Sequence, residues 1–183
     1  MKRKAAAAII PLLLGALVAV LSFFKLRDPA LWLYVKTGEI ILSTHRIPLT
    51  DPFSYTRPGA EWLNHSWLAE GAFALAGKGG QVAGLFVLRW LLLLGTFALV
   101  FFTARRRAGE AAAALLSALA IIAVSPRFVV RPELITFFLL ALLLALLDRA
   151  ARRGPLLCLP PLFLLWANLH GGFVIGLLTM LLA

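Results

Sequence analysis

The sequence predicts an all-α fold: a polytopic bundle of about five transmembrane helices, with an outer loop that carries interfacial helices. Two observations lead to this prediction. First, 62% of the 183 residues are hydrophobic and the mean hydropathy is +0.94, which means more apolar surface than a water-soluble fold of this length can bury. Second, the charged residues, 14% of the chain, gather at the ends of apolar runs about 20 residues long. We therefore expect a single membrane domain over residues 1–183.

Five apolar runs are candidate spans, because a helix needs about 20 mostly apolar residues to cross the hydrocarbon layer. They cover residues 5–24, 82–104, 108–124, 132–147 and 155–183. The first run could instead be a signal peptide, but its apolar region is longer than usual and no small-x-small cleavage site follows it. The last run reaches Ala183 without a polar tail, so we expect a chain truncated at its C-terminus.

Basic residues cluster at residues 2–4, 105–107 and 149–153. Short cytoplasmic loops are enriched in Lys and Arg, so one orientation, with the N-terminus in the cytoplasm, explains all three clusters. The same distribution explains the net charge of +10 without a nucleic acid partner, because the basic residues do not cover one soluble face. The single cysteine, Cys158, excludes an internal disulfide and a cysteine-based metal cluster.

Residues 25–81 form the predicted outer loop, which is too polar to span a membrane and too apolar for a plain linker. Asp28 and Pro29 predict the N-cap and first turn of a helix that continues to Ile41. Prolines over residues 48–58 then predict an irregular, turn-rich stretch. Aromatic residues and leucines over residues 62–75 predict a second interfacial helix, which ends at the glycines of residues 77–80.

Several strings of this chain occur together in a known family. They are Lys36-Thr37-Gly38-Glu39, Thr50-Asp51-Pro52-Phe53-Ser54-Tyr55-Thr56, Trp62-Leu63-Asn64-His65-Ser66-Trp67-Leu68 and Trp166-Ala167-Asn168-Leu169-His170-Gly171-Gly172-Phe173. Together with Asp28 after the first span, they resemble the N-terminal part of GT-C type membrane glycosyltransferases, particularly bacterial proteins related to the protein O-mannosyltransferase and aminoarabinose transferase group. The resemblance covers nearly the whole chain. Two features depart from it: Pro29 stands where the family usually has a second acid, and full-length members have more spans.

The resemblance implies a transferase in a bacterial plasma membrane that moves a sugar from a polyprenyl-phosphate carrier to an acceptor on the outer face, with a divalent cation as a candidate cofactor. In that family an acid of the outer loop serves as general base or metal partner, and Asp28 stands at this position. Asp28 is equally well explained as the N-cap of the next helix, a role worth about 1 kcal/mol.

Further polar residues are candidates for binding substrate or metal. Asp51, His65 and Glu70 could contact an acceptor or a divalent cation, although their spacing matches no known ligand pair and Asp51 could simply cap the turn at Pro52. Arg89 lies about seven residues inside an apolar run, where a guanidinium either faces a polar cavity or reaches the headgroups. It could hold the phosphate of a lipid carrier.

Arg131 shares the outer rim with Arg127 and Glu133, and the three could complete a site for an anionic ligand or pair with lipid phosphates. Asn168 and His170 lie in the last apolar run, where polar groups tend to face the bundle interior. The two glycines that follow His170 could break the helix and let a substrate approach, or the whole group could be a helix-packing site.

Two functions from different classes remain open. The first is a GT-C-like glycosyltransferase, or its N-terminal fragment. The second is a non-catalytic integral membrane subunit that packs against other membrane subunits of a larger complex. A transporter fragment is disfavoured because the spans contain one His, one Asn and no acid near their middle, which leaves little chemistry for coupling transport to protons. The expected partners are membrane lipids and a polyprenyl-phosphate-linked sugar.

Overall fold

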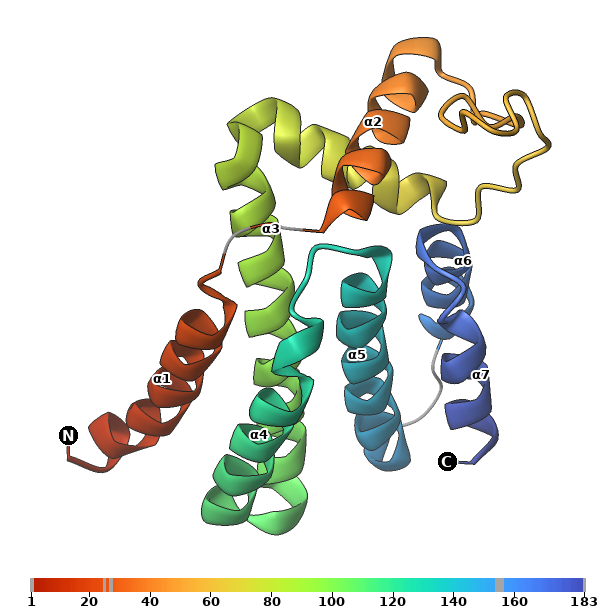
Figure 1. Cartoon of the computed structure of the whole chain (residues 1–183). Helices are drawn as coiled ribbons and strands as arrows, with labels where there is room; N and C mark the ends of the chain where they lie inside the picture. The colour runs from red at the N-terminus through yellow and green to blue at the C-terminus, as the bar shows by residue number, and fades with distance from the viewer. Residues whose placement is uncertain (1, 25, 27, 154–156, 183) are drawn as a thin grey trace.

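The computed structural model describes residues 2–24, 26, 28–153 and 157–182, with only the backbone described for residues 2–8 and 150–153 (Figure 1). The regular structure of these residues is helical, apart from an isolated antiparallel bridge between Thr50 and Glu61. In chain order the elements are α1 (Lys2–Ser22), α2 (Pro29–Thr44), α3 (Trp67–Ala108), α4 (Glu110–Val124), the 3-10 turn η1 (Ser125–Arg127), α5 (Pro132–Arg153), α6 (Leu159–Leu169) and α7 (Phe173–Leu181).

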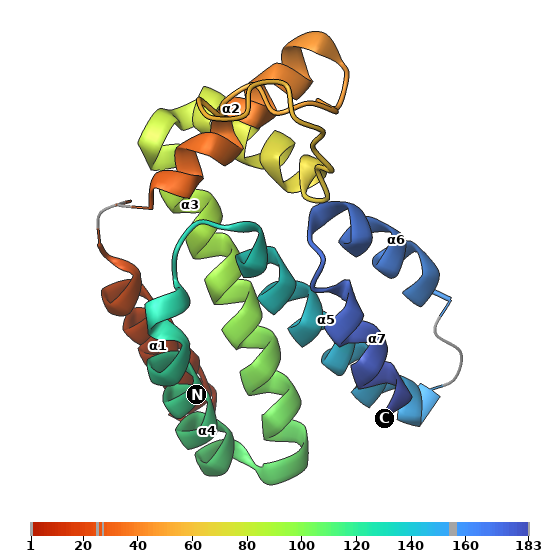
Figure 2. The same ribbon diagram turned by 45° about the vertical axis from the view of Figure 1, so that its right-hand side comes forward.

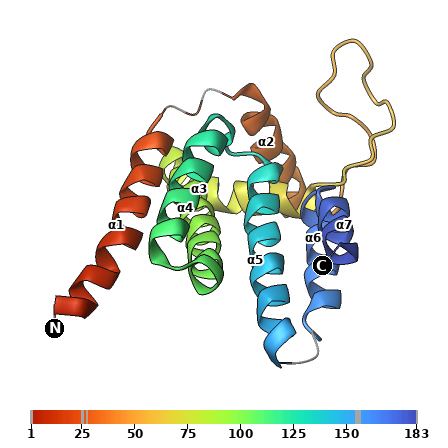
Figure 3. The same cartoon turned by 90° about the horizontal axis from the view of Figure 1, so that it is seen from below.

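The helices form a bundle with a cap at one end. Figures 1 and 2 show α1, the later part of α3, α4, α5, α6 and α7 side by side, while α2 and the first part of α3 lie across their ends. Seen from below, the irregular loop over residues 45–66 extends beyond the helices (Figure 3). We call α2, this loop and residues 67–80 the cap. The expectation of a structured loop with two helices is therefore met.

Two helices of the described residues are long and apolar enough to cross a membrane. They are α3, with 42 residues, and the continuous stretch Glu110–Arg127, with 18. Leu115, Leu116 and Leu119 on α4 are more than half exposed, as expected for side chains that contact lipid rather than water. These observations support a membrane protein. The remaining predicted spans stay predictions.

The last apolar run differs from its prediction as one span. It contains two short helices, α6 with 11 residues and α7 with 9. The chain runs along α6 to a turn at the cap end of the bundle and returns along α7 (Figure 2). Extended backbone at His170 interrupts the helix. Gly172 then comes so close to Thr136 that a Cβ atom there would lie 2.6 Å from the threonine hydroxyl. His170 therefore ends α6, and Gly172 lets the turn pack on α5.

The helix predicted as the second interfacial helix is continuous with the second predicted span. The predicted break at residues 77–80 is helical, and the chain bends one residue later, at Gln81, whose φ of 52° and ψ of −133° are not helical. Gly84 allows the bend to be tight, because a Cβ atom there would collide with the carbonyl oxygen of Ala76. The first part of α3 thus lies across the bundle while the second part runs along it (Figure 1).

The start of α2 follows the prediction. The Asp28 carboxylate accepts a hydrogen bond from the Ala30 N–H at 3.1 Å, and Pro29 is the first helical residue. The helix ends at His45, which adopts a left-handed conformation and whose N–H donates a hydrogen bond to the Ile41 carbonyl. Gly38 lets α2 cross α3 at backbone distance, since a Cβ atom there would overlap the Glu70 carbonyl.

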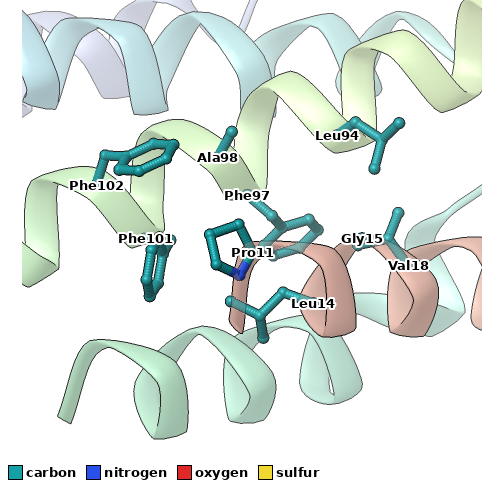
Figure 4. Close-up of a pocket in the computed structure, with 9 residues that line it drawn as sticks. All are labelled: Pro11, Leu14, Gly15, Val18, Leu94, Phe97, Ala98, Phe101 and Phe102. Atoms are coloured by element: carbon teal, nitrogen blue, oxygen red, sulfur yellow. The ribbon is translucent and has the colours of Figure 1, made fainter. Parts of the chain in front are cut away.

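Two apolar clusters hold the helices together. One joins the cap to α5 and α6 through buried Leu31, Phe73, Leu143 and Trp166. The other joins α1, α3 and α4, and beside it an apolar pocket of about 170 Å³ lies between α1 and α3 (Figure 4). At the end of the bundle away from the cap, Arg107 donates to Asp148 at 2.7 Å and so ties the end of α3 to α5.

Candidate functional site

Two neighbouring cavities lie at the capped end of the bundle, and cap residues line one of them. The loop cavity, of about 330 Å³, is lined by Tyr34 of α2, by Trp62, Asn64 and His65 of the loop, and by Glu70 of α3. The rim cavity, of about 420 Å³, is lined by Arg127 of η1, by Arg131, and by Thr136 and Phe137 of α5. Glu133 and His170 line both cavities, so these two side chains form the wall that the cavities share.

Arg131 is held by Asp28. Its Nε and Nη2 donate to the two carboxylate oxygens, with Nη2 at 3.1 Å from Oδ1. The side chain of Asp28 is 9% exposed and that of Arg131 is 39% exposed. The hydrogen bond from Arg131 lowers the pKa of Asp28, and the same bond raises the pKa of Arg131. A carboxylate with a lowered pKa is a weak proton acceptor, so the geometry favours Asp28 as the residue that orients Arg131.

Glu133 is the carboxylate best placed for chemistry. Its Oε2 atom is buried and has no hydrogen-bond partner among the residues that the structure describes. An unpaired buried polar atom costs about 1–3 kcal/mol, and the residue that carries this atom lines both cavities. The sequence placed Glu133 on the outer rim as one of three residues that could complete an anionic-ligand site, and did not predict it as a proton acceptor. The sequence feature that could have identified Glu133 is its position two residues after Arg131, at the start of α5.

His170 is fixed by hydrogen bonds with two neighbours, Thr136 and Gly172. Its Nδ1 atom lies 2.9 Å from the Thr136 hydroxyl and accepts from the Gly172 N–H at 3.0 Å. Thr136 in turn accepts from the indole Nε1 of Trp166 at 3.0 Å. Burial lowers the pKa of His170. The ring of His65 lies 6.5 Å away across the cavity wall, so both predicted histidines belong to the site.

Glu70 and Asn168 have structural partners. Asn64 donates to the buried carboxylate of Glu70, which anchors the end of the loop on α3. Asn168 accepts from the indole Nε1 of Trp67 at 2.9 Å and so joins α6 to the cap. This contact matches the helix-packing interpretation of Asn168, while Glu70 still contributes to the lining of the loop cavity.

Arg89 lies outside both cavities. It is fully buried, its guanidinium donates to the carbonyls of Ser22, Phe24 and Phe128, and its Cζ atom lies 4.7 Å from the ring centre of Phe24. The side chain therefore does not reach a headgroup surface. It joins the end of α1 to the segment after η1.

Asp51 also lies apart from the cavities. Its Oδ1 atom accepts from the backbone N–H groups of Phe53 and Ser54 at 2.8 and 3.1 Å. Asp51 thus caps the turn at Pro52, which is one of the two roles that the sequence suggested. Within the described part of the chain, no three His, Cys, Asp or Glu side chains are grouped to hold a metal ion. The candidate metal residues therefore separate, with His65 and Glu70 at the loop cavity and Asp51 in the turn.

Comparisons with protein-family models, with curated proteins and with solved structures give no match for this chain. The chemistry of the two cavities is therefore the basis on which a function can be proposed.

Proposed function

We propose that the protein is a GT-C-like membrane glycosyltransferase, or the N-terminal part of one, that transfers a sugar from a polyprenyl-phosphate carrier at the outer face of a bacterial plasma membrane. One observation supports this function above the others: an arginine-lined cavity and a carboxylate-lined cavity share a wall at the capped end of apolar helices. A phosphate-linked sugar on a lipid needs both kinds of site, close together and near the membrane surface.

The phosphate would lie in the rim cavity. Arg127 and Arg131 supply the positive charge, and guanidinium groups bind phosphate oxygens through two parallel hydrogen bonds. Asp28 occupies Nε and Nη2 of Arg131, which fixes the side chain and leaves Nη1 for a phosphate oxygen. Pre-orientation of this kind reduces the entropy lost when the ligand binds.

In the transfer step, the oxygen of an acceptor hydroxyl forms a bond to the anomeric carbon of the sugar. The bond between that carbon and the phosphate oxygen breaks, and its electron pair leaves with the polyprenyl phosphate. The hydroxyl proton passes to a carboxylate. The family resemblance gives this role to Asp28, but the hydrogen bond from Arg131 lowers the pKa of Asp28, so we assign the role to Glu133, which lines both cavities.

The alternative function, a non-catalytic membrane subunit, is favoured by a different observation. The pocket between α1 and α3 is lined by residues such as Leu14, Leu94 and Phe102, and none of the described side chains that line it is ionisable (Figure 4). An apolar helix of a partner subunit could pack there. A stable partner that copurifies with the chain, together with no affinity for a lipid phosphate, would favour this alternative.

Ligand binding tests the first proposal directly. The purified protein in lipid nanodiscs is titrated with farnesyl phosphate, and the Arg131→Gln variant is compared with Arg57→Gln, which removes the same charge from an exposed position of the loop. We expect Arg131→Gln to bind about tenfold more weakly and Arg57→Gln to bind like the wild type. Equal affinities for all three proteins, or no binding by the wild type, would contradict the proposal.

A further inference from the structure

The protonation state of His170 follows from its hydrogen bonds. The Gly172 N–H can only donate, and it points to Nδ1 at 3.0 Å. Nδ1 must therefore present a lone pair, which excludes a proton on this atom. Thr136 is consistent with this assignment, because its hydroxyl already accepts from the Trp166 indole and can donate its own proton to Nδ1.

The ring is consequently the neutral tautomer with its proton on Nε2. A second proton on Nδ1 would face the Gly172 N–H, and burial of the ring also disfavours the charged form. Among the described residues, none forms a hydrogen bond with Nε2. His170 therefore offers one oriented N–H donor at the wall between the two cavities.

The loop cavity has the lining of a site for a neutral polyhydroxyl group. Among the described residues, its lining contains the carboxylates Glu70 and Glu133 and no lysine or arginine, which disfavours a phosphate there. Carboxylates and the Asn64 amide can instead accept and donate hydrogen bonds to hydroxyl groups. Tyr34 and Trp62 add aromatic surface, and the volume of about 330 Å³ is within the range of small-ligand sites.

We propose that the loop cavity binds the neutral sugar of the lipid-linked ligand, and that His170, fixed as its Nε2–H tautomer by Thr136 and Gly172, donates a hydrogen bond to a sugar oxygen. This inference rests on the proposed function and adds to it the place of the sugar and the residue that recognises it. Thr136 and Trp166 are positioning residues, since they act through His170.

The tautomer is tested without any ligand. The protein is labelled with 15N-histidine in nanodiscs, and the His170 signals are assigned by their loss in a His170→Asn variant. We expect the nitrogen shifts of the Nε2–H tautomer at neutral pH, and a mixture of tautomers in Thr136→Val. A proton on Nδ1, or a doubly protonated ring, would overturn the proposal.

The sugar contact is tested with a matched pair of ligands, farnesyl phosphate and glucosyl farnesyl phosphate. The amide nitrogen of a His170→Gln side chain can occupy the place of Nε2, whereas His170→Asn keeps a polar group near Nδ1 and removes the donor. We expect His170→Asn to bind glucosyl farnesyl phosphate about tenfold more weakly, with no change for farnesyl phosphate. His170→Gln should remain close to the wild type.

The outcomes separate the two proposals. Wild-type protein that binds neither ligand would contradict the proposed function and the sugar site with it. The sugar site alone would be overturned if the wild type binds farnesyl phosphate but the His170→Asn variant binds glucosyl farnesyl phosphate as tightly as the wild type does. Should the His170 variants fail to fold, Trp62→Leu makes the same test, because Trp62 lines the loop cavity and lies far in sequence from the Thr136 contact. It should weaken only the glucosylated ligand, and equal loss for both ligands would count against the site.

Discussion

Asp28 and Arg131 are separated by 103 residues in the sequence and form a two-point ion pair at the rim cavity. The same carboxylate also caps α2 through the Ala30 N–H. One side chain therefore fixes the start of the cap and the arginine before α5, which places the cap over the bundle and the guanidinium at the cavity.

The Asp28–Arg131 pair should give the protein a defined pH dependence. The hydrogen bond from Arg131 lowers the pKa of Asp28 in the folded state, below the value of about 3.9 for an unfolded chain. The stabilisation is thus complete above about pH 4 and is lost as the pH falls through the folded-state pKa. Asp28→Asn should lower the free energy of unfolding by about 2 kcal/mol at neutral pH and lose this acid dependence, as measured by thermal unfolding in detergent.

Glu39→Gln is the control for this prediction. Glu39 pairs with Lys36 at 2.8 Å, but both side chains are more than half exposed, and exposed ion pairs contribute little. We expect its unfolding curve to match the wild type at neutral pH. An Asp28→Asn variant with the wild-type acid dependence would show that the pair does not stabilise the fold.

Arg89 should be required for folding rather than for ligand binding. Its guanidinium donates hydrogen bonds to the carbonyls of Ser22 and Phe24, and in Arg89→Met these carbonyls lose their donor. We expect a loss of about 3 kcal/mol in the free energy of unfolding, with a smaller loss for Arg89→Lys, which keeps one cationic donor. Affinity for farnesyl phosphate should be unchanged in the folded fraction. An Arg89→Met protein as stable as the wild type would mean that the cost of burying the charge cancels its hydrogen bonds.

The crossing of α2 and α3 should tolerate no side chain at Gly38. A Cβ atom there would overlap the backbone carbonyl of Glu70, so Gly38→Ala must separate the two helices and should cost about 3 kcal/mol. Gly71→Ala is the matched control, because it lies next to the same crossing but nothing is within 4 Å of its added Cβ. The control should be neutral or slightly stabilising. Thermal unfolding of the two variants compares them directly, and equal effects would contradict the close crossing.

Local patterns predicted local structure well in this chain. The Asp28–Pro29 pair predicted the start of α2 because capping depends on neighbouring residues alone. The glycines after His170 raised a break in the last apolar run only as an alternative to one continuous span, and the structure has extended backbone at His170. The direction in which α7 leaves the turn could not be predicted, because it depends on the contacts of α7 with α5 and α6 and not on neighbouring residues.

Long-range pairing could not be predicted from the sequence. The place of Arg89 inside an apolar run indicated that its guanidinium needs hydrogen-bond partners. The carbonyls to which it donates belong to segments before and after α3, and the sequence does not identify them. Asp28 appeared as an isolated acid until the fold brought Arg131 to it. Glu133 stood out only when the structure showed a buried oxygen without a donor on the shared wall of two cavities.

The bend in α3 should carry measurable strain at one residue. Gln81 has a φ of 52° and a ψ of −133°, a conformation that glycine adopts readily and that costs other residues about 1–3 kcal/mol. Gln81→Gly should therefore stabilise the protein by about 1 kcal/mol, whereas Gln81→Ala removes the same side chain and keeps the strain, so it should give no gain. Gly84→Ala should destabilise the bend, because its Cβ would meet the carbonyl of Ala76. Thermal unfolding of the three variants orders them, and a Gln81→Ala protein as stable as Gln81→Gly would show that the side chain, not the backbone, limits stability at the bend.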